Sequence, residues 1–375
     1  MAIERRLGTE NDPDIMVMGS AVEVFPEPSG SDEIRNAAEI LVSEESILLG
    51  DEQFEEQPPE MEFSANLAGV VEENILGKLA SDILSSINQD KESRSDWEKT
   101  YTDGLKYLGM KFDEGRSQPF EGSSGVIHPI LAEAVTQFQA QAYKEMLPAK
   151  GPVKTQIIGA RTVATETQAD RVQEFMNFYI MNVMKDYDPE MDMLLFYLPL
   201  AGSAFKKVYY DNVLNRAVSK FIAPEDLIVP YEASDLSSAE RVTHAISMSV
   251  NEIKKQQLSG FYIDVDISEN SFDSGESDVE AEIDKLQGIK AGYAEDRDHT
   301  VFEVHTILDL EGFEDAGEDG EPTGLKLPYI VTIDEPSEQV LSIRRNYNEG
   351  DPYANKINFF VQYKFLPGLG FYGLG

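Results

Sequence analysis

The sequence contains no cysteine among its 375 residues. This absence excludes disulfide bonds, thiolate metal sites and a cysteine nucleophile, and it is typical of proteins that assemble in a reducing cytoplasm. The sequence also lacks an apolar run long enough to span a bilayer. Acidic residues and Pro13 follow the basic start, where a signal peptide requires an apolar stretch. We therefore expect a protein that has no membrane segment.

Positive charge is scarce. The chain has 31 Lys and Arg residues against 69 Asp and Glu residues, a net charge of -38 and a pI near 4.3. A protein that holds phosphates through broad basic patches is not expected from this balance. The length is typical of roughly two to three domains.

Residues 1–65 have too few apolar side chains to form a core. Dense Asp and Glu residues alternate there with Pro26, Pro28, Pro58 and Pro59. Burial of so little apolar surface does not offset the entropy cost of ordering, so we predict an acidic disordered N-terminal arm. Residues 22–25 and 47–49 are alternatives, as short apolar motifs that order on a partner.

Residues 66–260 alternate between helical and strand patterns. Apolar residues at three- and four-residue steps predict helices, and their apolar stripes are expected to be buried. The predicted helices lie near residues 67–87, 97–107, 127–147, 172–183 and 191–198, and a short helix capped by Ser249 or Asn251 ends at Gly260. We predict strands at 153–158 and 241–250, and a hairpin from 204–210 and 217–222.

The remaining sequence is acidic at first and then rich in strands. Residues 261–299 are predicted to be an acidic linker with one helix around Val279, Ile283 and Leu286. Residues 300–365 are predicted to form a smaller antiparallel β-rich domain, set apart from the helical body, with strands near 300–310, 327–333, 339–345 and 356–365. The fold class is therefore predicted to be α+β.

Several stretches together resemble the portal proteins of short-tailed double-stranded DNA phages, the head-to-tail connectors. The first stretch carries Trp97, Tyr101, Leu105 and Tyr107, then a Gly/Ser loop at 122–125, then His128-Pro129 opening a Gln-rich helix that ends in Met146-Leu147-Pro148. The others are residues 205–210 followed by Pro224-Glu225-Asp226-Leu227, and residues 363–368. The resemblance covers most of the chain after Asn66.

The resemblance implies a structural, non-enzymatic subunit of a ring, usually a dodecamer, at one capsid vertex of the virion. Double-stranded DNA passes through such a ring without specific binding during packaging and ejection. The implied partners are the terminase large subunit, which hydrolyses ATP, and capsid and head-tail adaptor proteins. Assembly takes place in the host bacterial cytoplasm. Residues 66–260 are expected to form a wing-like body and residues 300–365 a clip-like domain that meets the terminase.

Two sets of residues are candidates for a role in that assembly. Basic pairs stand out in so acidic a chain and suit an acidic partner, although solvated surface faces are the alternative explanation: Arg344, Arg345, Lys206 and Lys207. Residues 366–375 are predicted to be a glycine-rich hinge with Pro367, Gly368, Gly370 and Gly373. On the resemblance this hinge leads into helices that the chain lacks, so the chain is expected to be truncated and to form rings poorly alone.

No catalytic, cofactor or metal site is nominated. The Gly368–Gly373 stretch matches G-x-G-x-x-G but has no following helix or ribose-binding acid. His299 and His305 lack a third ligand at zinc spacing, and Asp315 and Asp319 do not complete a calcium loop. Two other functions stay open: another virion protein, either a scaffolding or a head-tail adaptor protein, and a carboxylate-dependent hydrolase, which requires two acids in one cleft.

Overall fold

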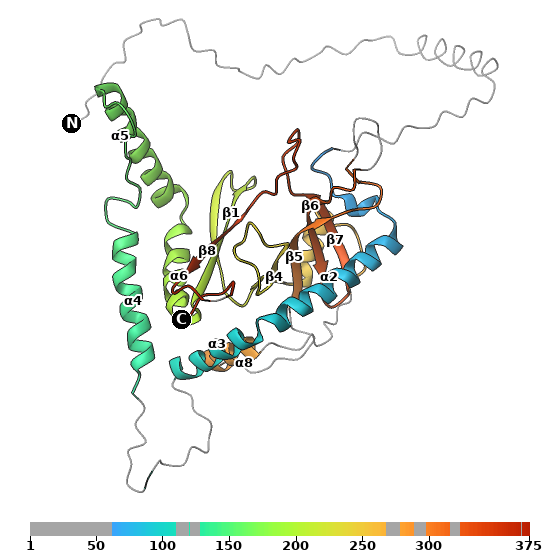
Figure 1. Ribbon diagram of the computed structural model, residues 1–375, viewed down its shortest axis with the longest axis horizontal. Coiled ribbons are helices and arrows are strands. Elements are labelled where there is room, and N and C mark those ends of the chain that lie inside the picture. Colours follow the sequence, from blue (N-terminus) through green and yellow to red (C-terminus); the bar gives the residue numbers. More distant parts are fainter. Residues whose placement is uncertain are drawn as a thin grey trace, which may run out of the picture. The chain divides into compact units, whose positions relative to one another are not determined.

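The computed structural model describes residues 62–109, 120, 128–267, 278–288, 298–315, 323–368 and 370–375. Helices and antiparallel sheets are mixed within these residues (Figure 1), so the α+β class is confirmed. Residues 1–61, and with them most of the predicted acidic arm, lie outside the described residues. In the part of the chain that is described, no helix combines the length and the apolar character needed to cross a membrane.

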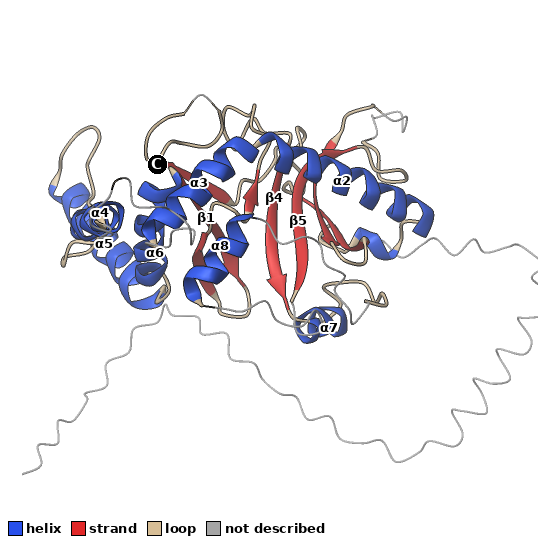
Figure 2. Ribbon diagram, turned by 90° about the horizontal axis from the view of Figure 1, so that it is seen from below, coloured by secondary structure: helices blue, strands red, loops and turns tan. Residues whose placement is uncertain are grey.

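The larger sheet has five antiparallel strands in the order β3-β4-β5-β6-β7. Its strands are β3 (Leu227–Ile228), β4 (Arg241–Met248), β5 (His299–Leu308), β6 (Leu327–Asp334) and β7 (Gln339–Arg345). Neighbouring residues of a strand point to opposite faces. Phe302 accordingly packs in one apolar core with helix α2 (Glu73–Ser93), whereas Val301 packs in another with Ile253 of helix α7 (Val250–Leu258). Figure 2 shows α2 running across the strands of this sheet.

The smaller sheet has three antiparallel strands in the order β2-β1-β8. They are β1 (Ser203–Asp211), β2 (Arg216–Ile222) and β8 (Phe360–Lys364). Helix α6 (Tyr187–Ala201) supplies Met191, Leu194 and Leu195 to the core beside this sheet. It ends at Gly202, whose φ of 76° is accessible to glycine at low cost. The hairpin predicted at 204–210 and 217–222 is confirmed.

Both sheets combine strands from the two predicted regions. β4 belongs to the predicted body and β5 to the predicted clip-like domain, yet they pair from Arg241↔Thr306 to Met248↔His299. β8 likewise pairs with β1, from Ser203↔Lys364 to Lys207↔Phe360. Residues 61–375 form one compact unit. The observed sheets therefore do not follow the predicted boundaries at 260 and 300, because a strand pattern does not show which partner each strand takes.

Helices α2 and α3 (Ser95–Leu108) follow each other with only Arg94 between them. Helix α3 begins without a side-chain cap, since the preceding position is Arg94 and no side chain accepts from the first turn. The capping prediction for α7 is confirmed: the Ser249 hydroxyl accepts from the backbone N–H of Glu252, and the Glu252 carboxylate accepts in return from the N–H of Ser249. Helix α8 (Asp278–Gln287) confirms the helix predicted in the linker and packs Val279 into the core of α3.

The strand predicted at 153–158 is wrong. Helix α4 (Ile130–Met146) is followed by an extended segment, but this segment joins neither sheet. The backbone groups of this segment form hydrogen bonds with amide side chains of helix α5 (Val163–Phe178). The Asn177 side chain accepts from the N–H of Val153 at 2.8 Å and donates to the carbonyl of Val153 at 3.0 Å. A β-like pattern can thus form an extended segment whose partners are side chains rather than a strand.

The predicted burial of the next stripe is also wrong. Helix α5 and the π-helix η2 (Tyr179–Val183) form as a helical segment, but none of their residues is buried. Val172, Phe175 and Met176 remain 47%, 61% and 39% exposed.

Candidate functional site

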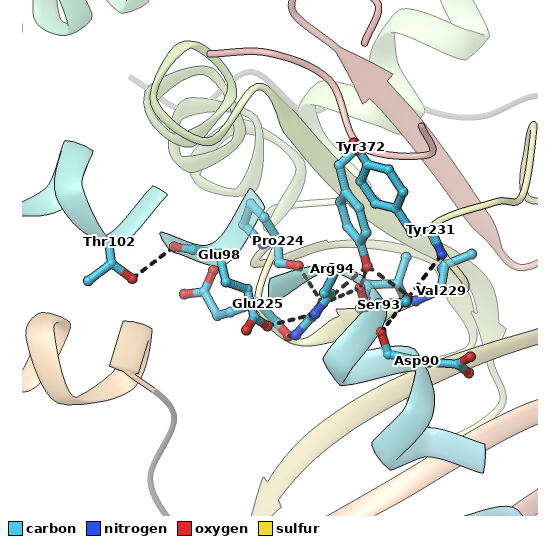
Figure 3. Close-up of polar contacts among 11 residues, drawn as sticks. Asp90, Ser93, Arg94, Glu98, Thr102, Pro224, Glu225, Val229, Tyr231 and Tyr372 are labelled. Atoms are coloured by element: carbon cyan, nitrogen blue, oxygen red, sulfur yellow. Dashed lines mark hydrogen bonds and ion pairs between the residues drawn. The ribbon is translucent and has the colours of Figure 1, made fainter. Parts of the chain in front are cut away.

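Arg94, between α2 and α3, is the centre of a buried polar cluster (Figure 3). The residue is 3% exposed, and its guanidinium donates to the backbone carbonyls of three residues that precede and form β3. The distances are 3.4 Å to Pro224, 2.7 Å to Glu225 and 3.0 Å to Leu227. Its Nε lies 2.7 Å from a carboxylate oxygen of Glu98, one turn along α3. One side chain therefore fixes the segment before β3 to both helices.

Tyr372 completes this cluster from the end of the described chain. Its phenol oxygen accepts from Arg94 at 3.1 Å and from the N–H of Val229 at 3.2 Å, and it donates to the carbonyl of Leu227 at 2.9 Å. Its ring stacks on Trp97 with centroids 4.4 Å apart, and the Trp97 indole N–H donates to the carbonyl of Ala201 at 3.0 Å. The cluster thus joins α3, α6, β3 and residues 370–375.

Two carboxyl groups beside Arg94 have pKa values near neutral pH. Burial raises the pKa of Glu225 to about 8, with the charge of Asp226 adding to the effect. Burial likewise raises the pKa of Asp226 to about 7, with a contribution from Glu280. Arg94 lowers both values only in part, because its donors go to backbone carbonyls rather than to these carboxylates. The cluster can therefore take up and release protons, although its Glu225 Oε2 is buried without a hydrogen-bond partner.

A second polar cluster links the two sheets. Lys207 of β1 lies 2.5 and 2.7 Å from the carboxylate oxygens of Glu303 of β5. The other neighbour of Glu303 is His305, with Nε2 at 2.7 Å. Burial alone raises the pKa of Glu303, but the hydrogen bond from His305 and the charge of Lys207 outweigh burial and hold it well below its usual range. The cluster is an inter-sheet ion pair.

The pocket next to this cluster is small. His305 and Phe360 line it together with Lys356, whose ammonium group donates to the carbonyls of Leu236 and Ala239. Its free space matches about one water molecule. Burial lowers the pKa of His305, and burial also lowers that of the adjacent His244 to about 4. Both histidines are therefore neutral at physiological pH, and the pocket that His305 lines has no room for an organic substrate.

All four cations predicted to meet a partner have contacts within the protein. Lys206 is 2% exposed and its ammonium group lies 4.4 Å from the ring centre of Tyr187, so it offers no surface charge. Burial lowers the pKa of Lys206 to about 8. Lys207 is the cation of the inter-sheet ion pair. Lys206 is thus buried on one face of β1 rather than placed where a partner could meet it, and a partner contact of Lys207 stays a prediction.

Arg344 and Arg345 are half-buried at the end of β7. Arg344 donates to the carbonyls of Ser64 and Phe261 at 2.7 and 3.1 Å. Arg345 donates to the carbonyl of Phe63 at 2.9 Å and lies over its ring at 5.1 Å. They hold residues 63–64 and 261 against the sheet edge, and a contact with another protein stays a prediction for both.

The predicted hinge is packed into the core. Phe371 and Tyr372 are 0% and 2% exposed, and the N–H of Gly373 donates to the Ser203 hydroxyl at 2.7 Å. A Cβ on Gly373 would lie 2.3 Å from the carbonyl oxygen of Gly202, so the close approach of the two backbones requires glycine. Pro367 is exposed, whereas Gly368 and Gly370 are half-buried. A hinge that leads to further helices stays a prediction.

The structure separates the histidines that share a strand. His299 lies 2.9 Å from the buried carboxylate of Asp334, which also accepts from the hydroxyl and N–H of Ser337. His305 has Glu303 and Asn346 as neighbours instead. In the described ranges, no group of three or more His, Asp and Glu residues could hold a metal ion. Asp319 of the calcium motif lies outside the described residues.

No protein-family model matches this chain, and no curated protein matches it. Arg94 and Tyr372, the centre of the candidate site, were not singled out by sequence reasoning. A single arginine in an acidic helical stretch and a tyrosine in a glycine-rich stretch carry no signal of mutual contact. The closest available signal was Pro224-Glu225-Asp226-Leu227, which contributed to the family resemblance.

Proposed function

We propose that this chain is a structural subunit of a phage portal ring. The proposal rests on the resemblance in residues 97–148, 205–227 and 363–368. It includes assembly as a ring, usually of twelve copies, in the host bacterial cytoplasm and a place at one capsid vertex of the virion. The ring would guide double-stranded DNA and contact the terminase large subunit, capsid proteins and head-tail adaptors.

The observation that carries the proposal is the excess of acidic residues, together with the contacts that four of the basic side chains make within the fold. The chain has 69 acids against 31 basic residues, and Lys206, Lys207, Arg344 and Arg345 are all engaged within the fold. What faces solvent is therefore rich in uncompensated carboxylates. An acidic channel wall repels phosphates, so DNA meets no deep electrostatic well and slides in both directions.

The two regions of the proposed subunit share their sheets. In this proposal the helices of residues 66–260 form the wing-like body, and the β5–β7 part of 300–365 forms the clip-like surface for the terminase. The β4–β5 pairing then makes the clip continuous with the body. A force on the clip would reach the body through a hydrogen-bonded ladder rather than through a flexible linker.

The rival functions have less support. Scaffolding and head-tail adaptor proteins are mainly helical, whereas two antiparallel sheets form the centre of this chain. A carboxylate-dependent hydrolase requires two acids facing one cleft. Glu225 and Asp226 have raised pKa values, but neither of them lines the pocket beside His305.

DNA mobility on native gels tests the conduit. We expect no shift of linear duplex DNA by the purified protein at physiological ionic strength, because its net charge is -38. A shift that persists as salt is raised would contradict a passive conduit.

Negative-stain imaging at high protein concentration tests assembly. We expect laterally associated subunits, curved oligomers and a minority of closed rings with a central opening. A protein that stays monomeric at every concentration would contradict the proposed ring.

A further inference from the structure

Helix α5 uses polar side chains to contact its own chain. Asn177 bonds to both backbone groups of Val153, and Gln173 accepts from the N–H of Thr155 at 3.1 Å. Gly151 has a φ of 93°, and a Cβ there would lie 2.3 Å from the Asn177 amide oxygen. The extended segment 151–158 therefore occupies the amide face of α5 and leaves its apolar face uncovered.

That uncovered face carries a regular apolar stripe. Val172, Phe175 and Met176 recur at steps of three and four residues, so they lie on one side of the helix, and they are 47%, 61% and 39% exposed. We call these three residues the α5 stripe. At its C-terminal end, the Tyr179 hydroxyl accepts from the N–H of Ala217 at 2.9 Å, which anchors the helix to β2. The stripe is thus held in place with its apolar side free.

The charge around the stripe is opposite to that of the chain. Residues 144–185, which we call the basic arm, contain six basic residues and four acids, a net charge of +2. The remaining chain is then at -40, since the whole chain is at -38. The basic residues of the arm are all exposed: Lys144, Lys150, Lys154, Arg161, Arg171 and Lys185.

Among the described residues, these six cations have no acidic partner. The ion pairs of the described residues involve other cations, among them Lys91, Arg94, Lys207, Arg216 and Arg241. Within the described part of the chain, none of the six in the basic arm makes an ion pair, although acids outnumber basic residues more than two to one.

We propose that the α5 stripe and the basic arm of one copy dock on an acidic surface of a second copy, outside residues 144–185 of that copy. This inference rests on the proposed ring and names the surface that holds it together. Because the arm is basic and the rest of the chain is acidic, the two contacting surfaces differ. Such a heterologous contact joins copies head to tail and gives a ring when the rotation between copies closes, whereas a self-complementary contact would stop at a dimer.

Duplex DNA is the alternative anionic partner for the six cations of the basic arm. The α5 stripe favours a protein partner over DNA, since a phosphate backbone has no apolar surface to cover Val172, Phe175 and Met176. The chain outside the basic arm, with a net charge of -40, also repels DNA. Burial of each large apolar side chain is worth about ten- to a hundred-fold in affinity, and exposed charge pairs add specificity and a dependence on salt.

The test compares two double variants with the wild-type protein. Val172→Glu with Phe175→Glu places charge in the stripe, and Lys150→Glu with Lys154→Glu reverses charge in the basic arm. Leu258→Glu is the matched control, because Leu258 is 90% exposed at the end of α7, outside the arm. Circular dichroism checks that each variant is folded. Sedimentation velocity then gives the dissociation constant for self-association at low and high salt.

We expect the stripe variant to weaken self-association by about 100-fold or more. The arm variant is expected to weaken it at low salt and to reduce its salt dependence, while Leu258→Glu changes it less than about twofold. If the wild-type protein assembles and the stripe variant assembles equally well, the inference is overturned and the ring proposal stands. If the wild-type protein is monomeric throughout, the ring proposal itself fails. A shift of duplex DNA that the arm variant abolishes would assign the arm to nucleic acid and overturn the inference.

Discussion

Arg94→Ala should destabilise the protein far more than a typical surface substitution. The guanidinium is 3% exposed and supports three backbone carbonyls, the Tyr372 hydroxyl and Glu98. After its removal, Leu227 still accepts from Tyr372, and Glu98, whose side chain is 23% exposed, can be hydrated. The carbonyls of Pro224 and Glu225 lose the donor that they share.

The expected size follows from those two carbonyls. A buried polar group left without a partner costs about 1–3 kcal/mol, and truncation of a buried charged partner costs about 3–5 kcal/mol in comparable sites. Part of the loss is offset, since Arg94 itself no longer has to be desolvated. We therefore expect Arg94→Ala to lower the free energy of unfolding by about 3–5 kcal/mol, a large part of the about 5–15 kcal/mol available to a native protein.

Urea unfolding followed by circular dichroism measures this loss. Hydrogen exchange adds a local readout at the N–H groups of Val229 and Phe371, which bond to the Tyr372 hydroxyl and to the Tyr231 carbonyl. Both amides should lose protection before the amides of β5 and β6. Arg94→Lys is the control: it keeps the charge but cannot span the same acceptors, so an intermediate loss is expected. A loss below about 1 kcal/mol for Arg94→Ala would refute the reasoning.

Three further outcomes are expected. Tyr372→Phe should cost about 1–3 kcal/mol in urea unfolding, because the N–H of Val229 loses its acceptor in a buried site; an unchanged midpoint would contradict this. Lys207→Met and Glu303→Gln should each destabilise the protein but couple by about 1 kcal/mol or more in a double-mutant cycle, and additive effects would show that the inter-sheet ion pair contributes little. The Glu225 carboxyl has a pKa of 4.5 when unfolded and about 8 when folded, so the folded state binds more protons and stability should fall as pH rises between these values. Glu225→Gln should flatten that decline between about pH 6.5 and 8.5, above the range in which the buried His244 titrates, whereas the exposed control Glu240→Gln should not.

The elements that sequence reasoning predicted correctly are those with a local cause. Ser249 and Glu252 form a capping box within four residues, and the alternating runs at 204–210 and 217–222 pair as a hairpin. In α6, Met191, Leu194, Leu195 and Leu198 form a stripe that is buried as predicted. Each of these signals lies in one short stretch, so neither the rest of the fold nor a partner is needed to interpret it.

The parts that could not be predicted depend on contacts between distant residues. Val153 carries a strand-like pattern, but its hydrogen-bond partner is Asn177, which lies 24 residues later on a helix. Arg94 meets Tyr372 across 278 residues. Lys206 and Lys207 look equivalent in sequence, yet their opposite orientations on β1 bury one against Tyr187 and pair the other with Glu303.

The α5 stripe shows the limit of periodicity most clearly. Val172, Phe175 and Met176 have the same spacing as Met191, Leu194 and Leu195 of α6, and spacing alone predicts burial for both sets. The two helices differ in what packs against them. α6 is in contact with α4 and β2, which bury its apolar stripe. The main contacts of α5 are hydrogen bonds from its polar side, where Gln173 and Asn177 bond to an extended segment of the same chain. A stripe indicates that a helix face is suited to apolar contact. Whether the same chain or another copy provides that contact depends on the charges beside it, and here these are the six cations of the basic arm.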